Sequence, residues 1–447
     1  MTASLSPAGT LVAAVDFGAT SIRVSVVDLD AVPLEPVVVH RYAHHPIRTS
    51  DGSLRWDWTR LVAEARRGLA LASQFGPLAS IGVDTWGLDY GLLDKSGDLV
   101  APPHSYRDQR LKDWQVTAER IGQRRLYDIT GTQLMAGNTI FQLAVHNRDE
   151  LVRTRHVLML PELLLHDLCG VVLAERTSAG TTALVDHRSG QWSDELIEEI
   201  GADRSWFSDL HIAGESVAIV DGVPIHLVGG HDTASAVLAM GPNPQSDDVF
   251  LSAGTLFLVG RDQQSVRTDD ESFTRNISHE PGVFGGARRL ANLPGMWLLE
   301  ECRRIWNADS VAAIMDTSVR QCETAQIIDV TDLTLVAPEN MPDAVCSLAG
   351  LPTSADRSDI VACIVESMAA AVADTVARID DDRTARSITV FGGGSQAQLL
   401  LDRIAARSDR SIQRGPVEAT TLGNALAQGI AIGRFADVDE ARRSLVP

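Results

Sequence analysis

The sequence predicts an α/β protein built from two halves, and three observations support this prediction. The chain has 447 residues, which exceeds the usual domain size of about 100 to 200 residues. Apolar strands alternate with amphipathic helices in both halves, as α/β layering requires. A strand, a turn of small residues and a returning strand occur near residue 11 and again near residue 249. We therefore expect two domains, residues 1–243 and 244–447.

Composition excludes several classes of protein. Hydrophobic residues make up 45% of the chain and charged residues 22%, which is typical of a soluble globular protein. The net charge of −20 opposes nucleic-acid and anionic-membrane partners, because both need a basic surface. Five scattered cysteines without a C-x-x-C pair indicate neither a zinc site nor a disulfide scaffold. We expect a cytoplasmic protein, either a monomer or a homodimer.

The first hairpin carries an acid at the end of a strand. Residues 11–15 form an apolar strand that ends at Asp16, residues 17–21 turn, and residues 22–27 return. Backbone N–H groups in such a turn can contact a phosphate, and the acid can hold Mg²⁺, usually through water. A plain hairpin in which Asp16 serves the turn explains this segment equally well.

The second hairpin repeats the pattern, with strands at residues 249–251 and 256–260 around the turn Ser252-Ala253-Gly254-Thr255. It is a weak signal alone. Two such hairpins from two domains could hold one polyphosphate chain between them. The polar, proline-containing segment 241–248 separates the halves and is typical of a domain boundary.

A glycine cluster follows a strand at residues 388–391. Gly392, Gly393 and Gly394 allow a ligand to approach the backbone closely, and Ser395 could N-cap a helix at residues 396–406. This segment could seat a nucleoside, although glycine clusters also serve tight packing. It matches neither a Walker A loop nor a G-x-G-x-x-G fingerprint.

A third segment carries the groups that bind sugars. Trp86 and Asp89 follow a strand at residues 80–84; an aromatic face can cover the apolar side of a sugar, and a carboxylate accepts its hydroxyl groups. The alternative is a buried Trp86 with Asp89 as a turn acid. Apolar spacing also predicts helices at residues 58–71 and 360–376, the second largely buried.

One carboxylate is a candidate catalytic base. An apolar strand leads through Gly229 and Gly230 to His231 and Asp232, just before a helix at residues 234–240. Asp232 or Thr233 could simply cap that helix. The positive end of a helix also favours an ionised carboxylate, the form that accepts a proton. We interpret His231 as a hydrogen-bonding or structural residue.

Together these segments resemble the FGGY family of carbohydrate kinases, and within it the chain is most similar to the L-rhamnulokinases. The resemblance covers about residues 12–432. The matching segments are residues 16–23, 82–89, Tyr106-Arg107-Asp108, 230–233, 252–255, Asn292 with Gly295 and Trp297, 391–394, and 415–424.

The resemblance implies two ribonuclease-H-like (actin-like ATPase) domains flanking a central cleft, and an ATP-dependent, Mg²⁺-dependent transfer that converts L-rhamnulose to L-rhamnulose 1-phosphate. It implies that Asp232 is the base and that Asp16 helps to hold Mg²⁺. The implied ATP contacts are Ala19, Thr20, Ser21, Ile22, Arg23 and Thr255, with Gly393 or Gly394 near the adenosine. The implied sugar contacts are Gly87, His231, Asp232, Thr233 and Asn292, beside Trp86 and Asp89 from the reading above.

The sequence departs from the rhamnulokinase pattern at two places. Residues 277–282 replace a Phe-Thr-Asn-Glu-Gly-Gly stretch, and Glu300 replaces a glutamine, which would add negative charge near the nucleotide. The substrate could therefore be a related ketose or polyol, such as L-fuculose, L-ribulose or L-xylulose. Actin-like ATPases that do not phosphorylate sugars are a further alternative, but they do not need the acceptor-side residues Trp86, Asp89, His231 and Asp232. A degenerate kinase that only binds sugar is a third reading, which intact Asp16 and Asp232 oppose.

Overall fold

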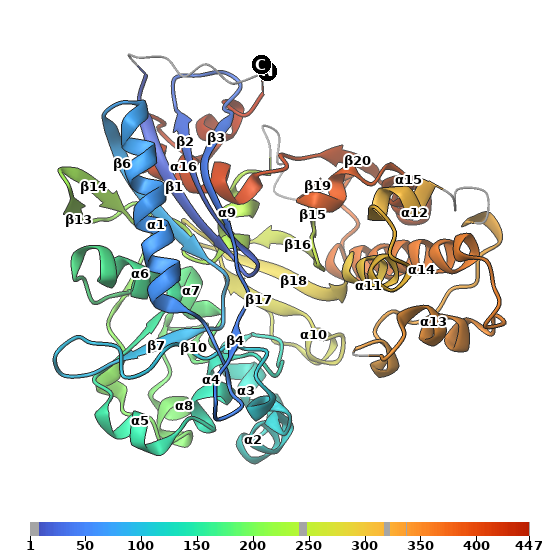
Figure 1. Ribbon diagram of the computed structural model, residues 1–447, viewed down its shortest axis with the longest axis horizontal. Coiled ribbons are helices and arrows are strands. Elements are labelled where there is room, and N and C mark those ends of the chain that lie inside the picture. The colour runs from blue at the N-terminus through green and yellow to red at the C-terminus, as the bar shows by residue number, and fades with distance from the viewer. Residues whose placement is uncertain (1–8, 241–247, 317–321, 337, 447) are drawn as a thin grey trace. The chain divides into compact units, whose positions relative to one another are not determined.

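A computed structural model describes residues 9–240, 248–316, 322–336 and 338–446. The chain forms two compact units (Figure 1). Unit 1 consists of residues 1–243, 263–288 and 418–447, and unit 2 of residues 244–262 and 289–417. After unit 2 has begun, the chain returns to unit 1 twice, at residues 263–288 and 418–447. The boundary segment itself, apart from Asp248, lies outside the described residues.

Unit 1 is built on a six-stranded sheet with the order β13-β14-β6-β1-β2-β3. Strand β1 is antiparallel to β2 and parallel to β6. The strands predicted at residues 11–15, 22–27 and 80–84 are confirmed and extend further. The bounds are β1 (Leu11–Gly18), β2 (Ser21–Asp28), β3 (Pro36–Ala43), β6 (Leu78–Thr85), β13 (Ser216–Val220) and β14 (Val223–His226).

The register of this sheet separates an apolar face from a polar one. Val15 pairs with Val24 and Val83, and all three belong to the hydrophobic core. The next residue, Asp16, pairs with Arg23 on one side and with Asp84 on the other. Because successive side chains point to opposite faces, Asp16, Arg23 and Asp84 lie side by side on the second face.

Helices cover both faces of the sheet. Helix α1 (Trp58–Ala72), predicted at residues 58–71, and helix α6 (Leu160–Cys169) pack in the same core as the valines (Figure 1). On the polar face, α16 (Ala419–Ala431) contacts the sheet through the hydrogen bond from Gln428 Nε2 to the Ala13 carbonyl (3.1 Å). Helix α9 (Asp232–Leu238) packs against α16 at Gly423, where a Cβ would lie 1.7 Å from the Ser235 carbonyl oxygen. Only glycine allows this approach.

The remainder of unit 1 encloses a second hydrophobic core around residues such as Phe141, Trp192 and Leu196. Its helices are α2 (Trp114–Ile121), α3 (Gln123–Thr130), α4 (Thr139–Ala144), α5 (Arg148–Arg153), α7 (Arg176–Gly180), α8 (Asp194–Glu199), α10 (Asp270–Thr274) and α17 (Val438–Arg443). Its short strands are β4 (Ile47–Arg48), β5 (Leu54–Arg55), β7 (Tyr90–Leu93), β8 (His156–Met159), β9 (Ala174–Glu175), β10 (Val185–Asp186), β11 (Gln191–Trp192), β12 (Leu210–His211) and β17 (Ser278–Pro281).

Unit 2 contains a sheet with the strand order β18-β16-β15-β19-β20. The second predicted hairpin is confirmed as β15 and β16, and β15 is parallel to β19. The strands are β15 (Val249–Ala253), β16 (Leu256–Gln263), β18 (Ala287–Pro294), β19 (Ser387–Phe391) and β20 (Ser411–Arg414). The helices are α11 (Trp297–Trp306), α12 (Val311–Asp316), α13 (Met341–Ala349), α14 (Arg357–Ile379) and α15 (Gln398–Ser408).

Helix α14 is the buried helix predicted at residues 360–376. Among the described residues it is the one helix long and apolar enough to cross a membrane, but 72% of its most apolar window is buried within the protein. Glu366 at its centre is fully buried and forms ion pairs with Arg403 and Arg407 of α15. These contacts identify α14 as the core helix of unit 2.

Two capping predictions are wrong. Ser395 does not cap α15, because the glycine cluster continues into a 3₁₀ turn (Gly393–Gln396) and the helix begins only at Gln398, with Ala397 at its N-cap. Helix α9 begins at Asp232, so His231 occupies the N-cap, and the His231 side chain makes no capping hydrogen bond. Asp232 therefore stands in the first turn, where its Oδ1 accepts the N–H of Thr233.

Candidate active site

The polar face of the first sheet presents two carboxylates held by one guanidinium and two residues of α16. Arg23 contacts Asp16 Oδ2 at 3.0 Å and Glu418 Oε2 at 2.7 Å. Asn424 Nδ2 donates to Asp84 Oδ2 at 2.6 Å, and Thr421 Oγ1 donates to Asp16 Oδ2 at 3.4 Å.

Among the described residues, no group forms a hydrogen bond with Oδ1 of Asp16 or Oδ1 of Asp84, and both oxygens are buried. Burial raises the pKa of Asp16 to about 6 against the opposing charge of Arg23. Burial and the charge of Asp16 raise the pKa of Asp84 well above its ordinary value. When both acids are ionised, the pair carries more negative charge than Arg23 neutralises, so the ionised site favours a further cation with a preference for oxygen ligands.

Asp232 lies in the first turn of α9, with its side chain 26% exposed. Its Oδ1 accepts hydrogen bonds from the Thr233 N–H (2.6 Å) and the Thr233 hydroxyl (3.2 Å). Among the described residues all of its hydrogen bonds use Oδ1, which leaves Oδ2 available to accept a hydrogen bond or a proton from a bound hydroxyl group. The charge of Asp232 also raises the pKa values of Asp16 and Asp84, so these three carboxylates share one electrostatic environment.

His231 connects Asp232 to a buried ion pair. His231 Nδ1 lies 3.3 Å from Glu280 Oε2, and its Nε2 lies 3.5 Å from Asp232 Oδ1. Burial opposes ionisation of Glu280, but His231 and Arg288 (2.9 Å) outweigh it and lower the Glu280 pKa to about 2. An ionised Glu280 favours the tautomer in which His231 Nδ1 carries the proton. The structure thus agrees with a hydrogen-bonding role for His231, and it adds Glu280 and Arg288 as its partners.

The turn of the first hairpin presents only part of the predicted phosphate loop. Thr20 is exposed, and Ala19 and Ser21 are half-buried, so their backbone can approach a ligand. The side chain of Ile22 lies in the hydrophobic core, so Ile22 can contribute only backbone groups. Arg23 forms ion pairs with Asp16 and Glu418, so besides any contact with a phosphate it holds these two carboxylates in place.

Trp86 and Asp89 form a closed cluster behind the polar face. Asp89 is fully buried, and its carboxylate accepts hydrogen bonds from the indoles of Trp56 (2.7 Å) and Trp86 (3.0 Å) and from Gln142 (3.2 Å). The Trp86 ring is 5% exposed and packs on Trp56, with ring centroids 4.6 Å apart. Asp89 therefore faces no open space, contrary to the interpretation that it accepts sugar hydroxyls. It orients the two indoles instead.

Gly87 and Leu88, which lie between Trp86 and Asp89, adopt a constrained backbone. A Cβ at Gly87 would lie 2.8 Å from Thr181 Cγ2, so glycine is required for this approach. Leu88 has a φ of 81° and donates its N–H to Thr181 Oγ1 at 3.1 Å. Strained backbone of this kind is frequent at functional sites, and the role of Gly87 in binding a sugar stays a prediction.

Unit 2 gathers most of its predicted nucleotide residues at one edge of its sheet. The exposed Thr255 follows β15, and Gly393 and Gly394 follow the parallel neighbour β19. A Cβ at Gly394 would lie 2.7 Å from the Ala253 side chain, whereas Gly393 faces open space. Helix α11 joins this edge because the Trp297 N–H donates to the Thr255 carbonyl (3.2 Å).

Glu300 and Asn292 also belong to unit 2. Glu300 lies exposed on α11 and forms an ion pair with Arg303 at 2.6 Å. The extra negative charge inferred from the sequence is therefore largely balanced one turn further along the same helix. Asn292 lies half-buried in β18.

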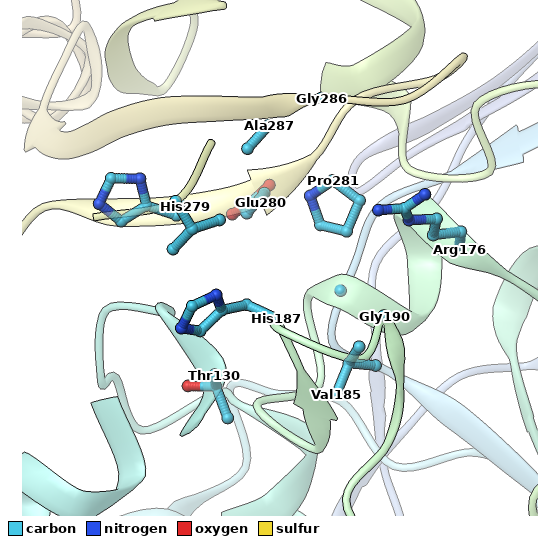
Figure 2. Close-up of a pocket in the computed structure, with 12 residues that line it drawn as sticks. Thr130, Arg176, Val185, His187, Gly190, His279, Glu280, Pro281, Gly286 and Ala287 are labelled. Carbon is cyan, nitrogen blue, oxygen red and sulfur yellow. The ribbon is translucent and has the colours of Figure 1, made fainter. Parts of the chain in front are cut away.

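A pocket in unit 1 lies between β17 and the turn that carries His187 (Figure 2). Arg176, His187, His279 and Glu280 contribute its polar groups. Glu280 is the same residue that contacts His231, so this pocket adjoins the Asp232 network from the side of β17. The sequence pattern gave no sign of it.

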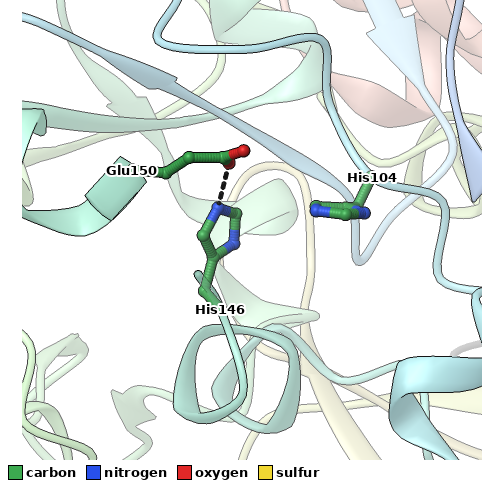
Figure 3. Close-up of side chains that lie close together, drawn as sticks. All are labelled: His104, His146 and Glu150. Carbon is green, nitrogen blue, oxygen red and sulfur yellow. Dashed lines mark hydrogen bonds and ion pairs between the residues drawn. The ribbon is translucent and has the colours of Figure 1, made fainter. Parts of the chain in front are cut away.

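A second cluster, formed by His104, His146 and Glu150, has the residue types and spacing of a metal site (Figure 3). Both Glu150 oxygens are engaged, one by His146 Nε2 and one by Arg55, each at 2.7 Å. Burial and the nearby charge of Arg110 lower the pKa of His104 to about 3. Arg55 already pairs with Glu150, the one acid of this cluster, and Arg110 adds a second positive charge near the imidazoles, which disfavours another cation.

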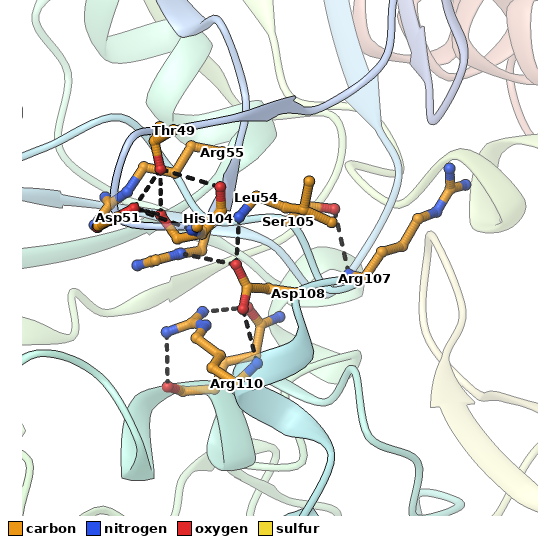
Figure 4. Close-up of polar contacts among 12 residues, drawn as sticks. Thr49, Asp51, Leu54, Arg55, His104, Ser105, Arg107, Asp108 and Arg110 are labelled. Atoms are coloured by element: carbon orange, nitrogen blue, oxygen red, sulfur yellow. Dashed lines mark hydrogen bonds and ion pairs between the residues drawn. The ribbon is translucent and has the colours of Figure 1, made fainter.

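This cluster continues into a structural network (Figure 4). Asp108 accepts the N–H groups of Leu54 and Arg110 and so anchors the segment after His104. Arg107 is exposed and points away from the network, toward its contact with the Tyr106 ring (5.1 Å).

Sequence reasoning missed three acids of the site. Asp84 belongs to the segment 82–89, but the sequence interpretation selected the other acid of that segment, Asp89, as a functional residue. The signal that distinguishes the two is that Asp84 stands at the end of the predicted strand 80–84, which pairs with the strand of Asp16. Glu418 and Glu280 come from distant segments, and only the tertiary contacts with Arg23 and His231 reveal them.

The amino-acid sequence is similar to those of rhamnulokinases. Rhamnulokinase of Pectobacterium carotovorum subsp. carotovorum (strain PC1) is 32% identical over 97% of this chain and 90% of its own length. Rhamnulokinase of Yersinia pestis (strain Pestoides F) is 32% identical over 96% of this chain and 92% of its own length.

Solved structures show the same fold. A ligand-bound xylulose kinase from Lactobacillus acidophilus superimposes with a TM-score of 0.82 at 15% identity, covering 97% of this chain and 91% of that one. Glycerol kinase of Plasmodium falciparum with ADP gives a TM-score of 0.78 at 15% identity, covering 98% and 92%.

The fold is that of the actin-like ATPases. More specifically, the chain belongs to the FGGY family of carbohydrate kinases: the family's N-terminal domain matches residues 11–239 and its C-terminal domain residues 231–432. It is a sugar kinase, and ATP and a sugar are its substrates.

Proposed function

We propose that the enzyme transfers the γ-phosphoryl group of ATP to the 1-hydroxyl of L-rhamnulose, with Asp232 as the general base. The observation that carries this proposal is the position of Asp232: a partly exposed carboxylate in the first turn of α9, in the electrostatic environment of Asp16 and Asp84. The rhamnulokinase relatives, which match nearly the whole chain, support the choice of sugar.

The chemistry assigned to Asp232 is proton acceptance from the attacking hydroxyl. The Thr233 N–H and hydroxyl bind Oδ1, and Oδ2 remains available to the sugar. Glu280 holds His231 through Nδ1, and the other ring nitrogen of His231, Nε2, lies 3.5 Å from Asp232 Oδ1. Phosphoryl transfer depends on positioning and charge neutralisation more than on covalent chemistry, so one well-placed base suffices.

The acid pair fits a magnesium ion. Asp16 and Asp84 each offer an unpartnered buried oxygen, and Mg²⁺ prefers one or two carboxylates together with substrate phosphates. We propose that Asp16 holds the ion with Asp84 beside it, while Arg23 keeps Asp16 in place. When bound, Mg²⁺ would neutralise the charge of the transferred phosphate.

A coupled ADP-release assay with L-rhamnulose, L-fuculose, L-ribulose, L-xylulose and glycerol tests the substrate. We expect the highest kcat/KM with L-rhamnulose, and a 1-phosphate as the product by NMR. A clearly higher kcat/KM with another ketose would reassign the substrate. If none of these sugars stimulates ADP release, the proposed substrate class is overturned.

A further inference from the structure

The loop that carries Asp232 is fixed from behind by helix α7. The N–H of Gly230 donates to Glu175 Oε2 at 3.0 Å, and the N–H of His231 donates to Thr177 Oγ1 at 3.1 Å. On the other side, the Gly230 carbonyl accepts the N–H of Thr85 at the end of β6 (2.8 Å). Two successive peptide groups before Asp232 are therefore held by the N-cap side chain of α7, Glu175, and by Thr177 in its first turn.

A single carboxylate oxygen joins the loop to that helix. Besides Gly230, Glu175 Oε2 accepts the Thr177 N–H (2.9 Å), the Thr177 hydroxyl (2.6 Å) and the Ser178 N–H (3.1 Å). Because the Thr177 hydroxyl gives its hydrogen to Glu175, its oxygen lone pairs face the His231 N–H. The direction of every hydrogen bond in this arrangement is thus determined.

The anchor lies deep in the protein and uses no counter-ion. Thr177 and Glu175 are 0% and 2% exposed. Glu162, also buried, accepts the Glu175 N–H (2.8 Å) and the Ser178 hydroxyl. Within the described part of the chain neither glutamate has an ion pair, so N–H and hydroxyl groups alone bind Glu175 Oε2, while Glu175 Oε1 is buried without a hydrogen-bond partner. Burial raises the pKa of Glu175, and these hydrogen bonds oppose that rise. Hydrogen bonds in such surroundings of low dielectric constant are stronger than in water.

We propose that Glu175 and Thr177 are positioning residues, which hold the loop at residues 229–231 so that the Asp232 carboxylate is aligned with its acceptor. This inference rests on the proposed role of Asp232. The loop contains two adjacent glycines, whose backbone is otherwise conformationally permissive. A misplacement of 1 Å can cost a reaction about a hundredfold in rate, so the anchor matters for turnover although it touches no substrate.

Thr177→Val tests the proposal, because valine keeps the shape and removes the acceptor for His231. Thr182→Val is the matched control: Thr182 is also fully buried, and its hydroxyl donates to the Ala179 carbonyl (2.6 Å) and accepts the Leu184 N–H (3.1 Å). Both variants lose two hydrogen bonds, but only Thr177 contacts the Asp232 loop. Thr177→Ser retains the hydroxyl and serves as the conservative rescue.

For Thr177→Val we expect kcat to fall at least about tenfold, while KM for the sugar and the Kd for ATP change by less than about threefold. Thr182→Val should lower Tm to a similar extent and keep kcat, and Thr177→Ser should restore most of the turnover. An unchanged kcat in Thr177→Val, or equal losses of kcat in Thr177→Val and Thr182→Val, would overturn the proposal.

Hydrogen exchange separates failure of this inference from failure of the proposed function. The amides of Gly230 and His231 should exchange faster in Thr177→Val than in Thr182→Val, whichever sugar is phosphorylated. Faster exchange without loss of kcat shows an anchor that does not position the base, and overturns the inference. Full activity in Asp232→Asn would instead refute the assigned base, on which the inference depends. A different preferred sugar leaves the comparison valid with that sugar.

Discussion

Asp16 and Asp84 pair in register on two neighbouring parallel strands, and within the described part of the chain each retains one buried oxygen without a hydrogen-bond partner. Burial raises the pKa values of both acids, and the charge of Asp16 adds to the rise at Asp84, so ionisation of the pair opposes folding. The arrangement is explained if a cation and phosphate groups occupy this edge of the sheet during turnover. The following predictions test this relationship and the network around it.

Asp84→Asn should raise the Mg²⁺ concentration needed for half-maximal activity and lower kcat by about 10- to 100-fold, because it removes one of the two charges. Asp89→Asn is the control, since Asp89 is equally buried five residues later but is occupied by two indoles. Asp89→Asn should keep the wild-type Mg²⁺ dependence. Identical Mg²⁺ titrations for wild type and Asp84→Asn would exclude Asp84 from the site.

Asp232→Asn should lower kcat by roughly a thousandfold, within the range of about 10² to 10⁴ for the loss of a general base. ATP binding, measured by calorimetry, should persist, because the predicted nucleotide contacts lie elsewhere in the sequence. Retention of most turnover in this variant would reject Asp232 as the base.

Glu162 should make folding stability depend on pH. Burial, and then the charge of Glu175, raise the pKa of Glu162 to about 7 from 4.5. Between these values the folded state binds a proton that the unfolded state has lost, so the free energy of unfolding falls as pH rises through this window, by up to about 3 kcal/mol. Urea unfolding from pH 4.5 to pH 7.5 measures it.

Glu162→Gln is the comparison for that experiment, because glutamine retains an acceptor oxygen and does not titrate. Its stability should fall less steeply with pH than that of the wild type. Other buried acids such as Asp16 and Asp89 titrate in both proteins, so the difference between the two curves reports Glu162. Parallel curves would contradict the raised pKa.

Arg288→Met should destabilise the protein by about 3 to 5 kcal/mol, because it leaves the buried Glu280 carboxylate without its cation. The double variant Arg288→Met/Glu280→Gln should recover part of that loss, since no uncompensated charge remains. A double-mutant cycle from urea unfolding measures the coupling. Additive effects of the two substitutions would show that the pair does not act as a unit.

Gly423→Ala should destabilise the packing of α16 on α9 and lower kcat, because the added Cβ meets the Ser235 carbonyl oxygen within the helix that begins at Asp232. The expected loss is about 1 to 3 kcal/mol. Gly429→Ala, on the same helix, meets only the side chains of Phe435 and Leu29 and should cost less activity. Thermal unfolding and kinetic assays distinguish the two variants. Equal effects of both substitutions on kcat would contradict the explanation that Gly423→Ala acts through helix α9.

Much of the fold follows from local sequence. The hairpins near residues 11 and 249, helix α1 and the buried helix α14 have apolar spacing that matches one type of element, so their prediction is confirmed with ends shifted by a few residues. Helix caps are harder to predict, as Ser395 shows, because the preceding glycines can continue a turn before the helix starts.

The sequence by itself determined the strands, the glycine turns and the segment that delivers Asp232, because periodicity and turn chemistry are local properties. Tertiary structure decided which role each of the neighbouring acids, Asp84 and Asp89, can take. Register places Asp84 beside Asp16, whereas three hydrogen bonds turn Asp89 into the core. Glu175 and Glu280 reach the Asp232 loop from segments about 50 residues away on either side. Such contacts depend on how distant elements pack, and no local pattern encodes them.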